Sequence, residues 1–126
     1  MAKLEQKLIG DFDQIIKLIE DGIKCGIPSA ALASWSDFSD GDSRCAVRVF
    51  DKYSYVDESK LSFSVTLFQK ANGPIHLSAI TAGGNQVEWL KINRSGEKEL
   101  LDKLKEITFN FQQSKWDGLL FYGGPI

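Results

Sequence analysis

The chain contains a single histidine, His76, so any imidazole acid–base chemistry would have to use it. His76 stands between Ile75 and Leu77 in a run that alternates apolar and polar residues, which places it on the polar face of an expected strand. Serine and threonine recur on neighbouring polar positions, and together they could form a hydroxyl-lined pocket with His76 as base. Solvent-facing strands carry the same residue types, because Ser and Thr tolerate both water and β geometry. We therefore assign no catalytic residue, and an enzyme using His76 is a second alternative function.

Arg44 and Arg48 lie four residues apart and share one face of an expected strand, with Lys52 continuing the row. Two guanidinium groups at this spacing could clamp a carboxylate or a phosphate. The alternate positions, which include Cys45 and Val47, would then form the apolar face. Basic side chains are also typical of solvated strand faces, where they discourage pairing with other chains. We favour a solvated face for this row.

Metal and redox chemistry have little support in the sequence. The two cysteines, Cys25 and Cys45, are far apart and fall in neither a CxxC nor a CxxH spacing. A single histidine cannot complete a thiolate site with them. We expect structural thiols, no metal and no cofactor.

Composition indicates an ordinary small domain. The 126 residues carry a net charge of −2, with 43% hydrophobic and 25% charged residues. This balance gives no basic surface for a polyanion, and no apolar stretch is long enough for a secretory signal or a membrane span. We therefore expect a cytoplasmic protein that binds neither nucleic acid nor membrane.

The first 28 residues predict a strand and then an amphipathic helix. Residues 3–9 favour a short strand. Asp11 can cap a helix, with Gln14 three residues on, while Gly26 and Pro28 can end it. In between, the apolar residues follow one helical face: Phe12, Ile15, Ile16, Ile19 and Ile23.

From residue 29 to 92 the apolar period changes to two, which is typical of strands with one buried face. Five runs are expected: a weak one at 29–38, and others around Val47, Phe63, Leu77 and Trp89. Short turns containing Asp-Gly, Asn-Gly or Gly-Gly lie between most of them and favour hairpins. With no helical crossovers between the runs, we predict an antiparallel meander.

Ser95 can cap a second helix whose stripe contains Leu100, Leu104, Ile107 and Phe111. We thus predict an α+β fold of β-α-β5-α order, in which a curved antiparallel sheet of about six strands packs on a long C-terminal helix. Residues 1–113 would form a single domain. Residues 114–126 would form an apolar tail that either packs back or stays exposed as an adhesive segment.

This order of elements resembles the helix-grip fold of the START and Bet v1-like proteins, where a curved sheet wraps a long C-terminal helix. The chain is shorter than those proteins and has one helix where they usually have two. The resemblance favours an internal ligand cavity. The stretches KLIGDFD (7–13), GDSRCAVRVF (41–50) and LSAITAGG (77–84) are similar to those of an uncharacterised family of small bacterial proteins, which has no function to carry over.

Our leading functional hypothesis is a non-enzymatic protein that binds a small apolar or amphipathic ligand between sheet and C-terminal helix. The polar candidates are His76, Arg44 and Arg48. The expected lining residues are Phe63, Val65, Leu77, Trp89, Leu104, Ile107 and Phe111. The alternative is an interaction or oligomerisation module without a small ligand, such as a homodimer formed through a sheet edge or through the C-terminal tail.

Overall fold

The computed structural model describes residues 2–54, 59–83 and 92–122, and the side chains of residues 2–53, 60–83 and 96–113. The predicted α+β fold is confirmed, with five strands in the described part of the chain. The predicted strand around Trp89 falls outside the described residues. The elements are β1 (Lys3–Leu8), α1 (Phe12–Gly26), β2 (Ala30–Asp40), β3 (Ser43–Ser54), β4 (Ser59–Lys70), β5 (Ile75–Gly83) and α2 (Ile92–Tyr122).

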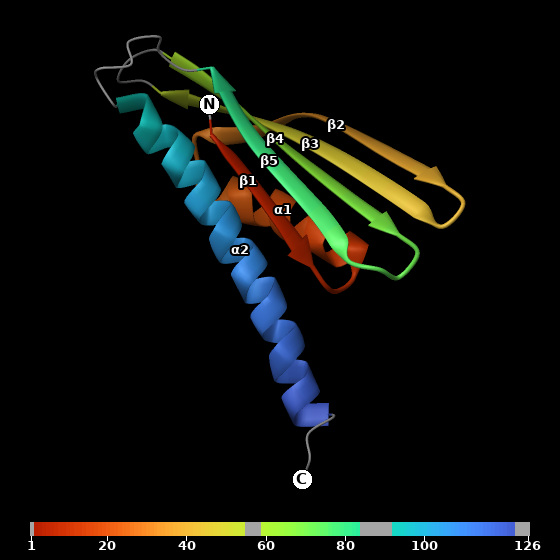
Figure 1. The fold of residues 1–126 in the computed structure, drawn as a ribbon. Helices are drawn as coiled ribbons and strands as arrows, with labels where there is room; N and C mark the ends of the chain where they lie inside the picture. Colours follow the sequence, from red (N-terminus) through yellow and green to blue (C-terminus); the bar gives the residue numbers. More distant parts are fainter. Residues whose placement is uncertain (1, 55–58, 84–91, 123–126) are drawn as a thin grey trace.

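The strands form one antiparallel sheet in the order β1-β5-β4-β3-β2 (Figure 1). Strands β2 to β5 are the predicted meander, and β1 pairs with β5, its register joining Lys3 to Ile80 and Leu8 to Ile75. The edges of the sheet are therefore β1 and β2. Because every neighbouring pair is antiparallel, these two edge strands run in the same direction.

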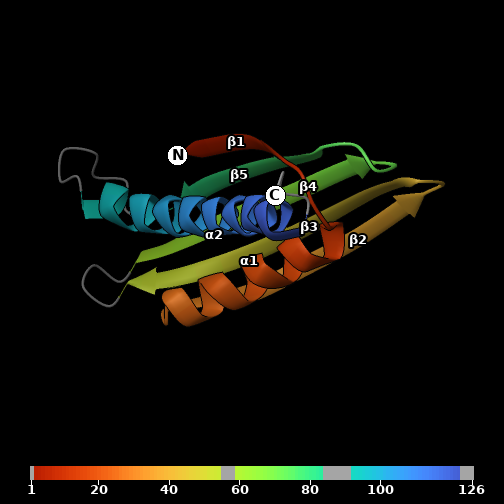
Figure 2. The ribbon, with the colours of Figure 1, turned by 90° about the horizontal axis from the view of Figure 1, so that it is seen from below.

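Both helices lie on one face of the sheet, α1 beneath β2 and β3 and α2 on the side of β1 and β5 (Figure 2). The α1 prediction is confirmed: Asp11 accepts a hydrogen bond of 2.8 Å from the Gln14 N–H, and the helix ends at Gly26. Its predicted apolar stripe is the buried one: Phe12, Ile15, Ile16, Ile19 and Ile23. Two amphipathic helices thus cover one sheet face and leave the other open.

The alternation of β4 and β5 is as predicted, with Phe63, Val65 and Leu77 facing the helices. The face assignment of β3 was wrong. Ala46, Arg48 and the other even-numbered residues face the helices, while Cys45 and the other odd-numbered residues lie on the open face. The reason is that Arg48 is paired with carboxylates of other elements, as described below, so its charge can be buried.

The helix α2 begins three residues before the predicted cap at Ser95 and continues past Gln113 to Tyr122. Its C-terminal part projects beyond the end of β1 (Figure 1). Within the described residues, no helix is long and apolar enough to cross a membrane.

Candidate functional site

Most residues predicted to line a ligand site lie together, as packed core. Phe63 and Val65 of β4, Leu77 of β5 and Leu104 of α2 are at most 2% exposed, and all belong to a single cluster of buried side chains. Phe111 is 5% exposed, and Ile107 packs against the same cluster. Trp89 lies outside the described residues. The described residues of this prediction therefore meet beneath α2 as members of one buried apolar cluster.

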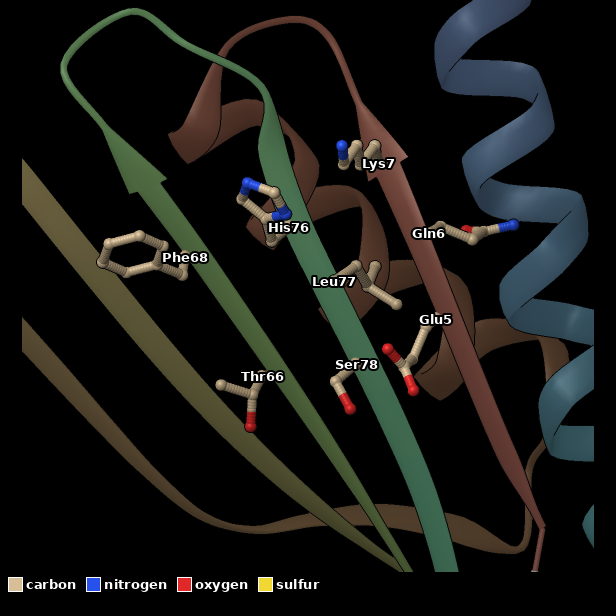
Figure 3. Close-up of a pocket in the computed structure, with 8 residues that line it drawn as sticks. All are labelled: Glu5, Gln6, Lys7, Thr66, Phe68, His76, Leu77 and Ser78. Atoms are coloured by element: carbon tan, nitrogen blue, oxygen red, sulfur yellow. The ribbon is translucent and has the colours of Figure 1, made fainter.

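His76 lies on the open face, as the alternation predicted, and it is exposed. It borders a shallow depression of about 370 Å³ between β1, β5 and β4 (Figure 3). Its ring faces that of Phe68 at 6.4 Å between centroids, and Lys7 lies opposite it on β1. Among the described residues, none forms a hydrogen bond with the His76 imidazole, so no orienting group or nucleophile is in hydrogen-bonding contact with it.

The two arginines of β3 bind carboxylates, but these carboxylates belong to the same chain and not to a ligand. The Arg48 guanidinium is 7% exposed and donates from Nε to Glu20 of α1 at 2.7 Å. Its Nη1 donates to Asp37 of β2 at 3.0 Å and to the Ser36 carbonyl at 3.3 Å. The predicted solvated face is therefore wrong for Arg48, which joins β3, α1 and β2.

Arg44 makes a similar but more exposed contact. It donates two hydrogen bonds, of 2.6 and 3.2 Å, to Asp13 of α1, and its guanidinium lies 4.5 Å from the centre of the Phe12 ring. The hydrogen bonds from Arg44 hold the pKa of Asp13 below its usual value. Burial alone would lower the pKa of Arg48, but its hydrogen bonds with Asp37 and Glu20 raise it overall. Both guanidinium groups are thus permanently charged and internally neutralised.

Two of the three most exposed large apolar side chains among the described residues lie on β2, which the sequence analysis did not single out. Leu32, Trp35 and Phe38 are 38%, 61% and 64% exposed, and beyond Ala30 every residue of this strand is exposed. Trp35 pairs with Arg48 and so lies on the helix side, whereas Phe38 pairs with Cys45 on the open side. The tip of the β2–β3 hairpin also extends past α1 (Figure 2). Apolar side chains on both faces of one edge strand are typical of surfaces that pair with another chain.

The sequence of β2 contains the signal that could have identified this edge. Exposed edge strands are normally protected by Lys, Pro, short length or a bulge. The eleven residues of β2 contain no Lys, Arg, Pro or Gly. The register shift between Leu32 and Ser34 is the one irregularity within the strand, and it leaves seven consecutive regular pairs from Ser34 to Asp40. Because this run is rich in serine and alanine, its strand pattern is weak. Its position at the edge of the sheet is nevertheless what exposes it to pairing with another chain.

The opposite edge, β1, borders a groove of about 520 Å³ beside α2. The Gln112 side chain reaches across from α2, accepting from the Ile9 N–H at 3.1 Å and donating to the Ile9 carbonyl at 2.7 Å. These are the two bonds that a neighbouring strand would make. Phe109 is 66% exposed at the groove, and Gln6 Oε1 is buried with no hydrogen-bond partner. Figure 3 shows the Gln6 side chain directed toward α2.

Comparison with known proteins gives a family without an assigned activity. A family model described as a family of unknown function (DUF6054) matches residues 1–112. No curated protein and no solved structure matches the chain. Among the described residues, no three His, Cys, Asp or Glu side chains are grouped so that they could hold a metal ion. The two edges of the sheet are therefore the candidate site that the geometry favours.

Proposed function

The chain belongs to the DUF6054 family, whose function is unknown, and we propose that it is an interaction module that associates with further copies of itself through the β2 edge. The observation that carries this proposal is the exposed edge from Ser34 to Asp40, seven consecutive regular pairs that contain no Lys, Arg, Pro or bulge. Alternate backbone N–H and C=O groups of β2 point away from β3 and need a hydrogen-bond partner, which a strand from another copy can supply as well as water.

Side chains add to the backbone interaction at this edge. Trp35 and Phe38 lie on opposite faces of β2, so a strand placed alongside would cover apolar surface on both sides. Aromatic side chains dominate the energy of most protein interfaces. Arg48 holds the Asp37 carboxylate and the Ser36 carbonyl, which fixes the middle of β2 against β3. An edge that is already ordered loses less conformational entropy on association.

The ligand hypothesis stays a prediction and has weaker support. Its described residues pack against one another beneath α2, so a ligand there would have to displace core side chains, each costing a few kcal/mol. A small molecule that co-purifies with the protein in native mass spectrometry would favour it. The enzyme hypothesis has less support still, because His76 is exposed and has no described hydrogen-bond partner.

The proposal is tested by light scattering on purified protein over a concentration series. We expect a mass that rises above the 14.1 kDa of one chain. Phe38→Lys places a protecting charge on the edge and should weaken association by roughly thirtyfold or more, the effect of losing an aromatic hot spot. Wild-type protein that stays monomeric at every concentration would refute self-association.

The matched control is Phe68→Lys, which puts the same charge on the open face two strands away from the β2 edge, at a residue that is 42% exposed. Association through the edge leaves this variant like wild type, whereas association through the open face abolishes its self-association. A chain that ends at Gln113 tests whether residues 114–126, and not the β2 edge, mediate association. It retains the whole family match and should associate unchanged.

A further inference from the structure

We propose that the β2 edge of one copy binds the groove between β1 and α2 of the next, so that the copies join head to tail. This inference rests on the proposed function and names the surface that receives β2. The alternative for the same edge is pairing of β2 with β2 in a closed dimer, which is the commoner kind of symmetry. Three features of the described residues favour the groove.

Charge is the first feature. The β2 strand contains Asp37 and Asp40 and no basic residue. At the other edge, Lys7 of β1 and Lys105 of α2 line the groove, and neither forms an ion pair with any described residue. Asp37 is already paired with Arg48, so Asp40 is the carboxylate of this strand that no described cation holds. Pairing β2 with the groove brings Asp40 to unpaired cations, which pairing β2 with β2 does not.

Position on the sheet is the second feature. Asp40 pairs with Ser43 and Lys7 pairs with His76, so both side chains lie on the open face. If the sheet of one copy continued into the sheet of the next, Asp40 of one and Lys7 of the other would lie on the same side. With Asp40 beside Lys7, Ser39 would lie beside Gln6 on the helix side, because Ser39 pairs with Arg44 of that face. The Ser39 hydroxyl is a donor of the kind that the buried Gln6 Oε1 lacks.

The backbone of β1 is the third feature. Gln112 already bonds the N–H and C=O of Ile9 as a neighbouring strand would. A hydrogen-bonding group held over α2 can therefore reach the backbone at this end of the edge, and Gln6, Lys7 and Leu8 of β1 line the same groove. An extended segment placed there would continue the sheet, which is the mode called β-augmentation.

The relative direction of the paired strands determines which kind of assembly forms. Since β1 and β2 run the same way within one chain, copies joined with their helices on the same side pair these strands in parallel. The same contact then repeats from copy to copy. A repeated heterologous contact gives a ring or an open filament, and it does not stop at a dimer.

The test uses two full-length variants, each altered at one edge. The edge variant is Phe38→Lys, and the groove variant combines Lys7→Glu with Lys105→Glu. Far-ultraviolet circular dichroism and melting temperature establish that both are folded. For head-to-tail assembly, light scattering should give monomers for each variant alone and a mass of two chains for their equimolar mixture, because one intact edge and one intact groove remain.

Other outcomes separate the two proposals. A groove variant that still forms dimers while the edge variant is monomeric would overturn the groove as acceptor and leave self-association through β2 intact. An edge variant that associates like wild type would overturn both. As a further check, Asp40→Lys should weaken assembly by about tenfold and regain most of it when mixed with the groove variant, because the charges are then exchanged.

Discussion

The two edges of the sheet are built differently. The β1 strand has six residues, three of them charged and exposed, and α2 reaches over its end through Gln112. The β2 strand has eleven residues, with Trp35 and Phe38 largely exposed and no basic side chain. A sheet that protected both edges would stay monomeric, and one that protected neither would aggregate. An edge with exposed aromatic and acidic side chains, opposite an edge that carries Lys7, directs association instead of preventing it.

The means by which each edge is held also differ. Leu8 is 3% exposed and anchors β1 in the core. Beyond Ala30, the β2 strand has no buried side chain, and Arg48 binds it through Asp37 and the Ser36 carbonyl. One edge is therefore fixed by apolar burial and the other by a buried charge. We therefore expect that each edge can be weakened by a substitution that leaves the other unchanged.

The largest effect is expected for Arg48→Met. This change keeps much of the side-chain volume but leaves Glu20 and Asp37 without their cation. Both carboxylates are partly exposed, at 34% and 59%, so we expect unfolding free energy to fall by about 2 kcal/mol. Urea denaturation measures this loss, and hydrogen exchange should show β2 amides losing protection before β1 amides. Equal loss at both edges would contradict the role of Arg48 in holding β2.

A smaller effect is expected for Gln112→Met at the other edge. Ile9 then loses both of its side-chain hydrogen bonds, which are exposed to solvent, and stability should fall by about 1 kcal/mol. The Ile9 amide should exchange faster, while β2 amides stay unchanged. Asn110→Met is the matched control, since this exposed residue lies on the same helix. If both variants behave alike, Gln112 does not protect the edge.

The smallest effect concerns Arg44, which joins β3 to α1 and touches neither edge. Its hydrogen bonds lower the pKa of Asp13, so the pair stabilises the fold above the unfolded-state pKa of roughly 3.9. That contribution disappears as pH falls through the lowered folded-state value. Because the Asp13 side chain is 71% exposed, we expect at most about 1 kcal/mol.

Arg44→Gln makes this pH dependence measurable. The difference in melting temperature between wild type and variant should be largest near neutral pH and shrink in acid, as the pH falls below the unfolded-state pKa of roughly 3.9. A difference independent of pH would assign the effect to the contact between Arg44 and the Phe12 ring. Self-association should be the same in both proteins.

Local sequence patterns predicted the helices and strands correctly wherever the apolar residues of the pattern are the buried ones. The capping residue Asp11 and the apolar spacing of α1 were sufficient for that helix, and the period of two gave the correct faces of β4 and β5. The β3 strand shows the limit. Its arginines were expected in solvent, but Arg48 is buried because Glu20 and Asp37 come from elements 28 and 11 residues away. No local window contains that pairing.

The candidate site was harder to predict than the fold. The ligand hypothesis selected the apolar side chains that meet beneath α2, and the described ones are packed core. What distinguishes β2 is its position at the edge of the sheet, which depends on β1 pairing with β5. The N-terminal strand could in principle have paired with β2. The strand order, which decides the exposed edge, follows from tertiary packing.

That pairing of β1 also bears on how the chain reaches its native state. The four strands of the meander are joined by connections of only a few residues, whereas the Ala2 amide meets the Thr81 hydroxyl across 79 residues of sequence. Closing so long a loop costs entropy that neighbouring hairpins do not incur. We expect the hairpins to form early and β1 to dock late, so pulse-labelled amides of β1 should gain protection last. Until then β5 has no partner on that side, and the folding chain has two unprotected edges on which to misassemble.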